Sequence, residues 1–415
     1  AAAAVMTGAA GSTAPTQAQL EALGITGITT GNLATVLAAI AATDDNGTGV
    51  DTLAELQAVV TAAAAAAAAL DTIKAAAEAN TATSGNLAAS VFTAAGVTGV
   101  DSTNLAAIQS ALDSAAVNGA AADTKPEVQA IVDAYNAIKA NADGTANNNA
   151  TNPTQAQYAA IGVTGVNSAE KESLLGDVID AKPFSAVDSV PEVQALADAA
   201  AAVMTGATGG TAPTQSQLEA LGITGVTPAN LAAVQAAIAA NGSGAAGVDT
   251  LSELQTVVTN AAAAAALTAI KDAAQANNAS DANVAASVFA TAGVTGVDSN
   301  NIAAIQSALN SGAVNGAAAD TKPEVQAIVD AYNAIKANAD NATATNPTDA
   351  QYAAIGVTGV DSAVKTSLLG DVIDGKAFAD VDTVPEVQAL ANAASAVMTG
   401  AAGGTAPTQA QLEAL

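Results

Sequence analysis

Apolar residues recur every three or four positions through much of the chain. Residues 104–113 (NLAAIQSALD) and 230–239 (NLAAVQAAIA) place Leu, Ile or Val at this spacing, and residues 128–138 repeat it with Val, Ile and Tyr. Such spacing puts the apolar side chains on one face of an α-helix. The many alanines between them also favour helix over strand. The pattern therefore predicts an all-α chain.

Helix starts are marked by capping boxes, in which Ser or Thr is followed three positions later by Glu or Gln. In four of the six boxes with Glu, Pro precedes the Glu, in the first helical turn where its missing N–H costs nothing. The six pairs are Thr52/Glu55, Thr124/Glu127, Ser189/Glu192, Thr250/Glu253, Thr321/Glu324 and Thr383/Glu386. Boxes with Gln follow Pro at Thr16/Gln19, Thr154/Gln157, Thr214/Gln217 and Thr348/Gln351.

A five-residue motif, G-[IV]-T-G-[IV], follows each short first helix. It starts at Gly24, Gly96, Gly162, Gly222, Gly293 and Gly356, with a mean spacing of about 66 residues. We expect its first Gly to end the helix in the left-handed conformation and the next apolar residue to fold back on the core. Asp, Asn, Ser or Thr then caps a second helix, and the box with Glu starts a third. Three helices joined by short turns predict a three-helix bundle.

The chain contains a second, longer repeat. Residues 124–143 and 321–340 are identical, and Val5 returns as Val203 after 198 positions and as Val397 after another 194. The predicted fold class is therefore all-α, a tandem array of small three-helix bundles grouped in threes into a repeat of about 200 residues. Because this period exceeds that of most solenoids, we expect beads with small cores of their own.

Each long repeat is divided into modules A, B and C. The predicted boundaries are 1–11 (end of a preceding module), 12–80 (A1), 81–146 (B1), 147–209 (C1), 210–277 (A2), 278–341 (B2), 342–404 (C2) and 405–415 (start of a further module). This division predicts that the chain is part of a longer array. Bundles of this size are marginally stable alone, so we expect contacts between neighbours.

Two alanine runs, 62–69 and 261–266, prolong the third helix of the A modules. We expect the first run to be a buried helix segment, because it is too short to cross a bilayer. The prolonged helix is expected to run toward module B as a stiff connector. No membrane insertion is predicted.

The composition lacks the residue types on which most enzyme classes depend. The chain has no Cys and no His, which excludes thiolate catalysis and the commonest general base and transition-metal ligand. A net charge of −28 repels nucleic acid and anionic membranes. We therefore predict neither an enzyme nor a nucleic-acid-binding protein, with no catalytic or cofactor-binding residues.

Aromatic residues make up 2% of the chain and occur in B and C modules alone. They are Phe92, Tyr135, Tyr158, Phe184, Phe289, Tyr332, Tyr352 and Phe378. An aromatic binding stripe is one interpretation. The other, which we favour, is that each is the large core residue of a bundle otherwise built from small residues, because each lies at or beside an apolar helical position.

Residues 44–55 (DDNGTGVDTLAE) are the best candidate for a metal site, since they approximate a calcium-binding loop. The candidate ligands are Asp44, Asn46, Thr48, Asp51 and Glu55. Thr48 stands where such a loop prefers Asp or Asn, and the second copy, GSGAAGVDTLSE from Gly242, lacks the early acidic residues. A polar turn leading into a capping box is the competing interpretation, and no cofactor other than calcium is considered.

Two repeated sequences, PTQAQLEALGITG and GVDTLAELQAVV, carry a resemblance to known proteins. With their Ala, Thr, Asn and Asp-rich, Arg-free surroundings they resemble the tandem helical repeats of giant bacterial secreted surface adhesins and extracellular fibre proteins. The resemblance covers the whole chain. It implies export by type I secretion and a location outside the bacterial cell, and it assigns no functional residue.

The expected function is that of a structural repeat in a long extracellular bacterial surface protein. It would act as a stalk, spacer or fibre body in adhesion or in a biofilm matrix, with neighbouring repeats or other copies of itself as partners. One alternative is a subunit of a self-assembling extracellular filament or surface layer, joined through contacts between beads. A second is a three-helix ligand-binding module.

Overall fold

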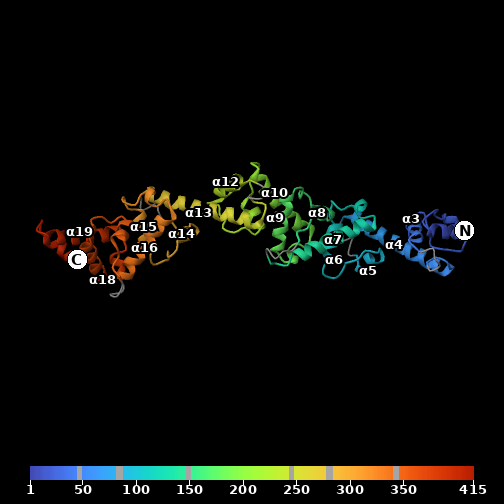
Figure 1. The fold of residues 1–415 in the computed structure, drawn as a ribbon, viewed down its shortest axis with the longest axis horizontal. Coiled ribbons are helices and arrows are strands. Elements are labelled where there is room, and N and C mark those ends of the chain that lie inside the picture. The colour runs from blue at the N-terminus through green and yellow to red at the C-terminus, as the bar shows by residue number, and fades with distance from the viewer. Residues whose placement is uncertain (44–48, 81–86, 146–150, 243–246, 277–283, 340–344) are drawn as a thin grey trace. The chain divides into compact units, whose positions relative to one another are not determined.

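The computed structural model describes residues 1–43, 49–80, 87–145, 151–242, 247–276, 284–339 and 345–415. Over these ranges the regular secondary structure is helical, and the described residues form no strand. They contain one isolated β-bridge, between Asp143 and Pro183. The predicted all-α class is confirmed. The described elements follow the same order in both long repeats (Figure 1).

From α1 to α10, the helices lengthen from the first to the third within each predicted module. They are α1 (Ala2–Ala9), α2 (Gln17–Glu21), α3 (Leu33–Ala41), α4 (Leu53–Ala79), α5 (Ala89–Ala94), α6 (Leu105–Leu112), η1 (Gly119–Ala121), α7 (Lys125–Asn141), α8 (Gln155–Ala160), α9 (Ala169–Asp180), η2 (Phe184–Ala186) and α10 (Val190–Ala207). The 3-10 turns η1 and η2 were not predicted by the sequence pattern.

The second long repeat continues in the same order. Its elements are α11 (Gln215–Ala220), α12 (Leu231–Asn241), α13 (Leu251–Ala276), α14 (Ala286–Thr291), α15 (Ile302–Leu309), η3 (Gly316–Ala318), α16 (Lys322–Ala339), α17 (Asp349–Ala354), α18 (Ala363–Asp374), η4 (Phe378–Asp380) and α19 (Val384–Ala401). Helix α20 (Gln409–Ala414) then repeats α2 and α11.

The chain forms two compact units. Residues 1–223 and 239–254 make up the first, and residues 224–238 and 255–415 the second. In the first unit, one hydrophobic cluster joins α1 and α2 to α3 and α4 through residues including Val5, Leu20 and Val36. Helices α12 and α13 contribute residues to both units.

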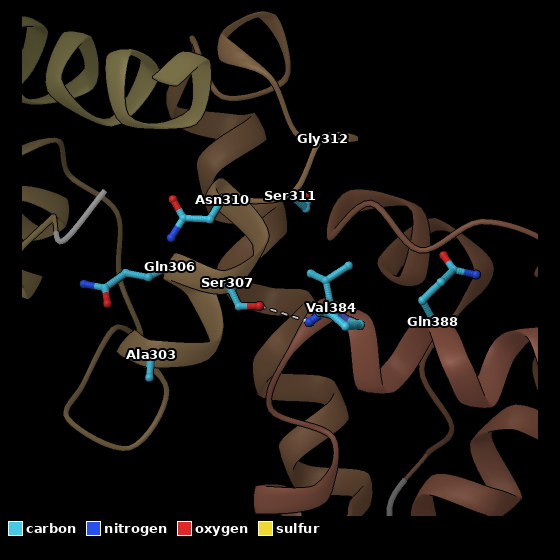
Figure 2. Close-up of a pocket in the computed structure, with 9 residues that line it drawn as sticks. Ala303, Gln306, Ser307, Asn310, Ser311, Gly312, Val384 and Gln388 are labelled. Carbon is cyan, nitrogen blue, oxygen red and sulfur yellow. Dashed lines mark hydrogen bonds between the residues drawn. The ribbon is translucent and has the colours of Figure 1, made fainter. Parts of the chain in front are cut away.

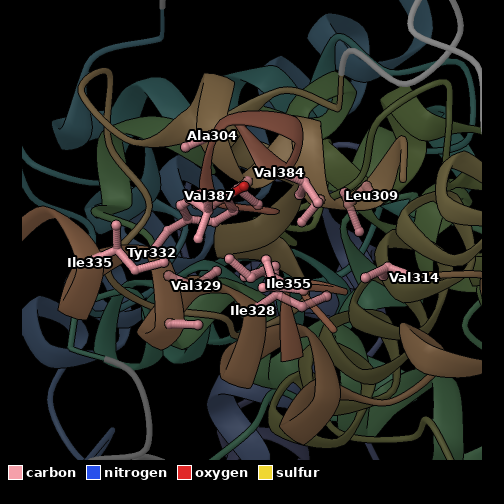
Figure 3. Packing of buried hydrophobic residues seen from close by; sticks show 14 of the residues in the cluster. Ala304, Leu309, Val314, Ile328, Val329, Tyr332, Ile335, Ile355, Val384 and Val387 are labelled. Carbon is pink, nitrogen blue, oxygen red and sulfur yellow. The ribbon is translucent and has the colours of Figure 1, made fainter. Parts of the chain in front are cut away.

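The second unit has a hydrophobic core that crosses the predicted boundary between B2 and C2. Tyr332 of α16 lies in the same cluster as Ile355 and Val387 of C2 (Figure 3). The expectation of beads with separate cores is therefore wrong for this pair. The reason is that α16 packs against α17 and α18 of C2 as well as against α15 of its own module. The expected contacts between neighbouring modules are confirmed here.

Helix α4 runs without interruption for 27 residues, a length of about 40 Å at the usual rise per residue. It contacts α3 on one side of the alanine run and α5, α6 and η1 on the other. Leu56 and Val60 are buried before the run, and Ile73 and Ala77 are buried after it. The expected connector from module A1 to B1 is confirmed.

The alanine run of α4 is more open than expected. Within residues 62–69, Ala63 and Ala69 are buried and the others are exposed or half-buried. The expectation of a buried segment is wrong, because this part of the helix has left one group of partners before reaching the next. By length and composition alone α4 is long and apolar enough to cross a membrane, alone among the described helices.

Candidate functional site

The predicted Glu capping boxes form at all six positions. In each, the Glu carboxylate accepts the backbone N–H of the Ser or Thr three residues earlier, for example at 3.0 Å between Thr52 N and Glu55 Oε2. The predicted Gln boxes form as well, as at Thr16 and Gln19. These contacts occupy orphan backbone donors at the helix start, so they fix helix ends.

The G-[IV]-T-G-[IV] motif has the expected left-handed first Gly, with φ of 82° at Gly24. Ile25 N–H then donates to Leu20 O at 3.3 Å, the six-to-one bond that ends a helix. The apolar residue after the first Gly is buried in every copy, as predicted. The second Gly of the motif, such as Gly27 with φ of 88°, is also left-handed, which the pattern did not predict.

Between these two glycines the motif is held by a glutamine from the third helix. Thr26 N–H donates to Gln57 Oε1 at 3.0 Å, and Gln57 Nε2 donates to Thr26 O at 3.1 Å. The amide side chain thus pairs with both polar groups of one peptide residue. We call this arrangement the Gln–Thr clamp. The other clamps are Thr98/Gln129, Thr164/Gln194, Thr224/Gln255, Thr295/Gln326 and Thr358/Gln388.

Each clamp glutamine has a further partner one turn along its own helix. Gln57 Nε2 also donates to Thr61 Oγ1 at 3.1 Å, and Gln129 Nε2 to Asp133 Oδ1 at 2.8 Å. The remaining four make the same contact with Asp198, Thr259, Asp330 and Asn392. An amide nitrogen has two hydrogens to donate, and both are used. The clamp therefore has no donor left for a ligand.

Sequence reasoning missed the clamp, although a signal for it was present. The glutamine stands two residues after the capping Glu in all six copies, as E-L-Q or E-V-Q. Its partner Thr lies 30 or 31 residues earlier in the chain. A contact between residues so far apart in the chain produces no short-range periodicity in the sequence.

The predicted calcium loop falls largely outside the described residues. Asp44, Asn46 and Thr48 lie there, so the site stays a prediction. Of its other two candidate ligands, Glu55 caps α4 through Thr52. A side-chain hydrogen bond with Glu55 raises the pKa of Asp51 and lowers that of Glu55. Among the described residues no group of three or more Asp or Glu side chains is placed to hold a metal ion.

Most of the aromatic residues lie in the core, as the favoured interpretation predicts. Phe92, Phe289 and all four tyrosines are fully buried. The two exceptions, Phe184 and Phe378, are half-buried at the 3-10 turns η2 and η4. Phe378 packs against the core cluster of the second unit, and the Lys336 ammonium lies 5.8 Å from its ring centre. No aromatic stripe is formed.

A groove recurs at the same place in both long repeats. It lies between α6 and α10, with a volume of about 610 Å³, and again between α15 and α19, with about 620 Å³. Ser110 Oγ accepts Val190 N–H at 3.0 Å in the first groove, and Ser307 Oγ accepts Val384 N–H at 3.1 Å in the second (Figure 2). These bonds join module B to module C.

The chemistry of the groove differs between its copies. Burial raises the pKa of Asp113 in the first, but the second has Asn310 at this position. In the first groove the side-chain amide of Gln109 donates a hydrogen bond to the backbone carbonyl of Leu87. In the second groove Gln306 donates in the same way to Val284. The two described grooves share no pair of acid and base, and the contact that they do share is the serine that accepts a backbone N–H of α10 or α19.

Comparisons with known proteins add no assignment. No protein-family model, no curated protein and no solved structure matches the chain. The candidate sites must therefore be judged by their geometry. The features that recur are the caps, which close the start of a helix, and the clamp and the serine contact, which join separate segments of the chain.

Proposed function

We propose that the chain is a structural repeat of a long extracellular bacterial surface protein. It acts as a stalk, spacer or fibre body in adhesion or in a biofilm matrix. The observation that carries this proposal is the Gln–Thr clamp, which occurs six times with its polar atoms turned to the chain itself. A repeat whose most regular polar residues serve its own folding suits a mechanical role better than a catalytic one.

The array in this proposal consists of three-helix units that are interlocked. The third helix of one unit also packs on the first helix of the next, which is supported by the contacts of α7 with α8, of α10 with α11 and of α19 with α20. Such sharing couples neighbours in a way that independent beads would not. The continuous helix α4 supports the same arrangement between A1 and B1.

The composition agrees with export and life outside the cell. A chain without Cys forms no wrong disulfides in an oxidising environment. Helices whose partners are close in the sequence fold fast after translocation. The charge of −28 keeps the chain soluble. The resemblance to secreted adhesin repeats supports the same location.

The stalk role is tested by lengthening the chain by one period. A second copy of residues 199–392 is inserted after Asn392, where the two long repeats are in register. We expect negative-stain electron microscopy to show that the contour length grows by a fixed increment while the width stays constant. A rounded particle whose width grows with the insertion contradicts the proposal. Repeating the measurement with a calcium chelator tests the loop at residues 44–55, because a calcium-dependent array would lose its fixed length.

A further inference from the structure

The two B modules contain the same Asn–Gly pair at the same place. Asn118–Gly119 stands at the start of η1 and Asn315–Gly316 at the start of η3, within stretches of identical sequence, residues 116–143 and 313–340. In both copies the Asn is exposed and the Gly is buried. Because the local sequence is the same, any difference in reactivity between the two pairs comes from the fold.

An Asn–Gly pair can lose ammonia without an enzyme, and Asn is among the thermolabile residues of proteins. The backbone nitrogen of Gly loses its proton and attacks the side-chain carbon Cγ of Asn. The new N–Cγ bond closes a five-membered imide, the Cγ–Nδ2 bond breaks, and Nδ2 leaves as ammonia after water returns the proton to it. Gly favours the attack because it has no Cβ to hinder a close approach of the backbone.

Water then opens the imide at one of its two carbonyl carbons. Opening at the side-chain carbonyl gives Asp, and opening at the main-chain carbonyl gives isoaspartate, in which the main chain runs through Cβ and Cγ. No oxidant or reductant is involved. Direct hydrolysis of the side-chain amide would give Asp alone, so isoaspartate identifies the route through the imide.

The two Asn residues start from the same geometry. Asn118 has φ of −86° and Asn315 has φ of −93°, and both have ψ of 178°. In each, Oδ1 accepts the backbone N–H two residues later at 3.0 Å. The ion pairs beside the two turns also correspond, and they are Lys74–Asp123 at 3.5 Å and Lys271–Asp320 at 3.7 Å.

The partner of the glycine N–H differs between the copies. Gly119 N–H donates to Oε2 of Glu78, in the last turn of α4, at 3.1 Å. The counterpart of Glu78 is Gln275, in the last turn of α13. It lies against Gly316, where an added Cβ would stand 3.0 Å from Gln275 Oε1, but no described residue accepts the Gly316 N–H in a hydrogen bond. A neutral amide thus replaces the carboxylate in the second copy.

The carboxylate of Glu78 slows the reaction in two ways. It holds the Gly119 N–H in a charge-assisted hydrogen bond, which must break before the nitrogen can turn toward Cγ. It also opposes loss of the N–H proton, because a second negative charge would form beside its own. Neither effect acts on Gly316.

We propose that Asn315 is a site of spontaneous deamidation and that Glu78 protects its counterpart Asn118 from the same reaction. The co-reactant is water. The proposal concerns the chemical ageing of the chain and stands apart from the stalk role.

The modification should weaken the contact between η3 and α13. Isoaspartate adds a carbon to the main chain at Asn315, directly before a glycine that packs closely on Gln275 and on the carbonyl of Lys271. It also removes the bond from Ala317 N–H to Asn315 Oδ1. The second unit should therefore lose stability as the protein ages, before the equivalent part of the first unit does.

The test ages the folded full chain at neutral pH and follows both pairs by mass spectrometry. After denaturation, trypsin releases residues 75–139 and 272–336, because Pro follows Lys125 and Lys322, and neither peptide contains the Asn–Gly pairs at Asn46 and Asn241. Fragmentation of each peptide locates the modified Asn. We expect conversion about tenfold faster in the second peptide than in the first, the effect of one hydrogen bond to a charged group. Labelling by an isoaspartyl methyltransferase should detect isoaspartate there.

Reciprocal substitutions isolate the carboxylate. Glu78→Gln gives the first copy the amide of the second and should raise the rate at Asn118 to that at Asn315, whereas Gln275→Glu should lower the rate at Asn315. Asp71→Ala is the control, because it removes an exposed carboxylate from α4 about two turns before Glu78, and it should change neither rate. In urea the two pairs should react equally fast, because their local sequences are identical. Circular dichroism checks that each variant retains its helices.

Four results would overturn the proposal. The first is an Asn315 that stays intact in the folded chain after the chain in urea has been converted. The second is an equal rate at both pairs, and the third is a faster rate at Asn118, which would mean that Glu78 acts as a base. The fourth is a difference that persists in urea, which would place its cause outside the fold.

Discussion

Two residues of the third helix, separated by one position, have different tasks. The Glu of E-x-Q binds the start of its own helix, whereas the Gln binds the G-[IV]-T-G-[IV] motif of the first helix. One turn of the third helix therefore fixes both its own start and the end of the first helix. Neither contact depends on a large apolar side chain, which suits modules whose cores are rich in alanine.

Loss of one clamp should measurably weaken the second unit. Gln326→Ala removes two hydrogen bonds to Thr295, each worth about 1 kcal/mol net, and should lower the free energy of unfolding by about 1–2 kcal/mol. Urea unfolding followed by circular dichroism measures the change. Gln409→Ala is the control, because this exposed side chain bonds to Glu413 on its own helix and should cost less than about 0.5 kcal/mol. Equal losses in both variants would reject a special role for the clamp.

The tyrosines predict how stability depends on alkaline pH. Burial raises the pKa of Tyr135, Tyr158, Tyr332 and Tyr352 far above the usual value of about 10. Because the folded-state pKa is the higher one, the stabilisation is complete below pH of about 10 and is lost as pH rises above it. Phenolate absorbance should therefore stay low in the folded chain at a pH where the urea-unfolded chain is ionised. Coincident titration curves would show that the phenols reach solvent.

At the scale of elements, the sequence predicted what is decided within a few residues. Helix starts at Thr52 or Thr154 follow from a cap and its partner three positions away, and the left-handed Gly24 follows from the helix that it ends. The predictions of separate cores and of a buried alanine run were wrong, because both features depend on which helices from other modules pack against α16 and α4. The calcium loop was a local pattern too, but three of its ligands lie outside the described residues.

The positions of the lysines predict where trypsin cuts the native chain first. Eight of the ten lysines lie in helices, and Lys182, between α9 and η2, is followed by Pro183, which blocks cleavage. Lys376 lies between α18 and η4 and is followed by Ala377. Proteases need a locally opened segment, so the first cut should fall after Lys376. Mass spectrometry of a brief digest identifies the site.

Lys376→Gln should then prolong the lifetime of the intact chain several-fold. Lys365→Gln, in the first turn of α18, serves as the control and should leave the rate unchanged. Early cuts after helical lysines such as Lys74 or Lys271 would instead show that the long helices open easily. The assay thus reports on the local stability of the helices as well as on exposure.

At the scale of the whole molecule, charge opposes association between copies. Each copy carries −28, and just ten basic residues are available to offset the repulsion. The screening length falls from about 30 Å at 0.01 M salt to about 8 Å at 0.15 M. Association between copies should therefore increase with salt over this range, as measured by light scattering. Association that falls with salt would mean that ion pairs, rather than apolar contacts, hold the copies.

The sharing of long helices between neighbouring modules also bears on how such a gene can change its length. Helix α16 serves the modules on both sides of it, so a deletion that joins unlike points of the repeat leaves a helix with the wrong partner on one side. A crossover between equivalent points of two long repeats restores a complete helix wherever the breakpoint falls. Unequal recombination can thus add or remove whole periods while every core stays filled.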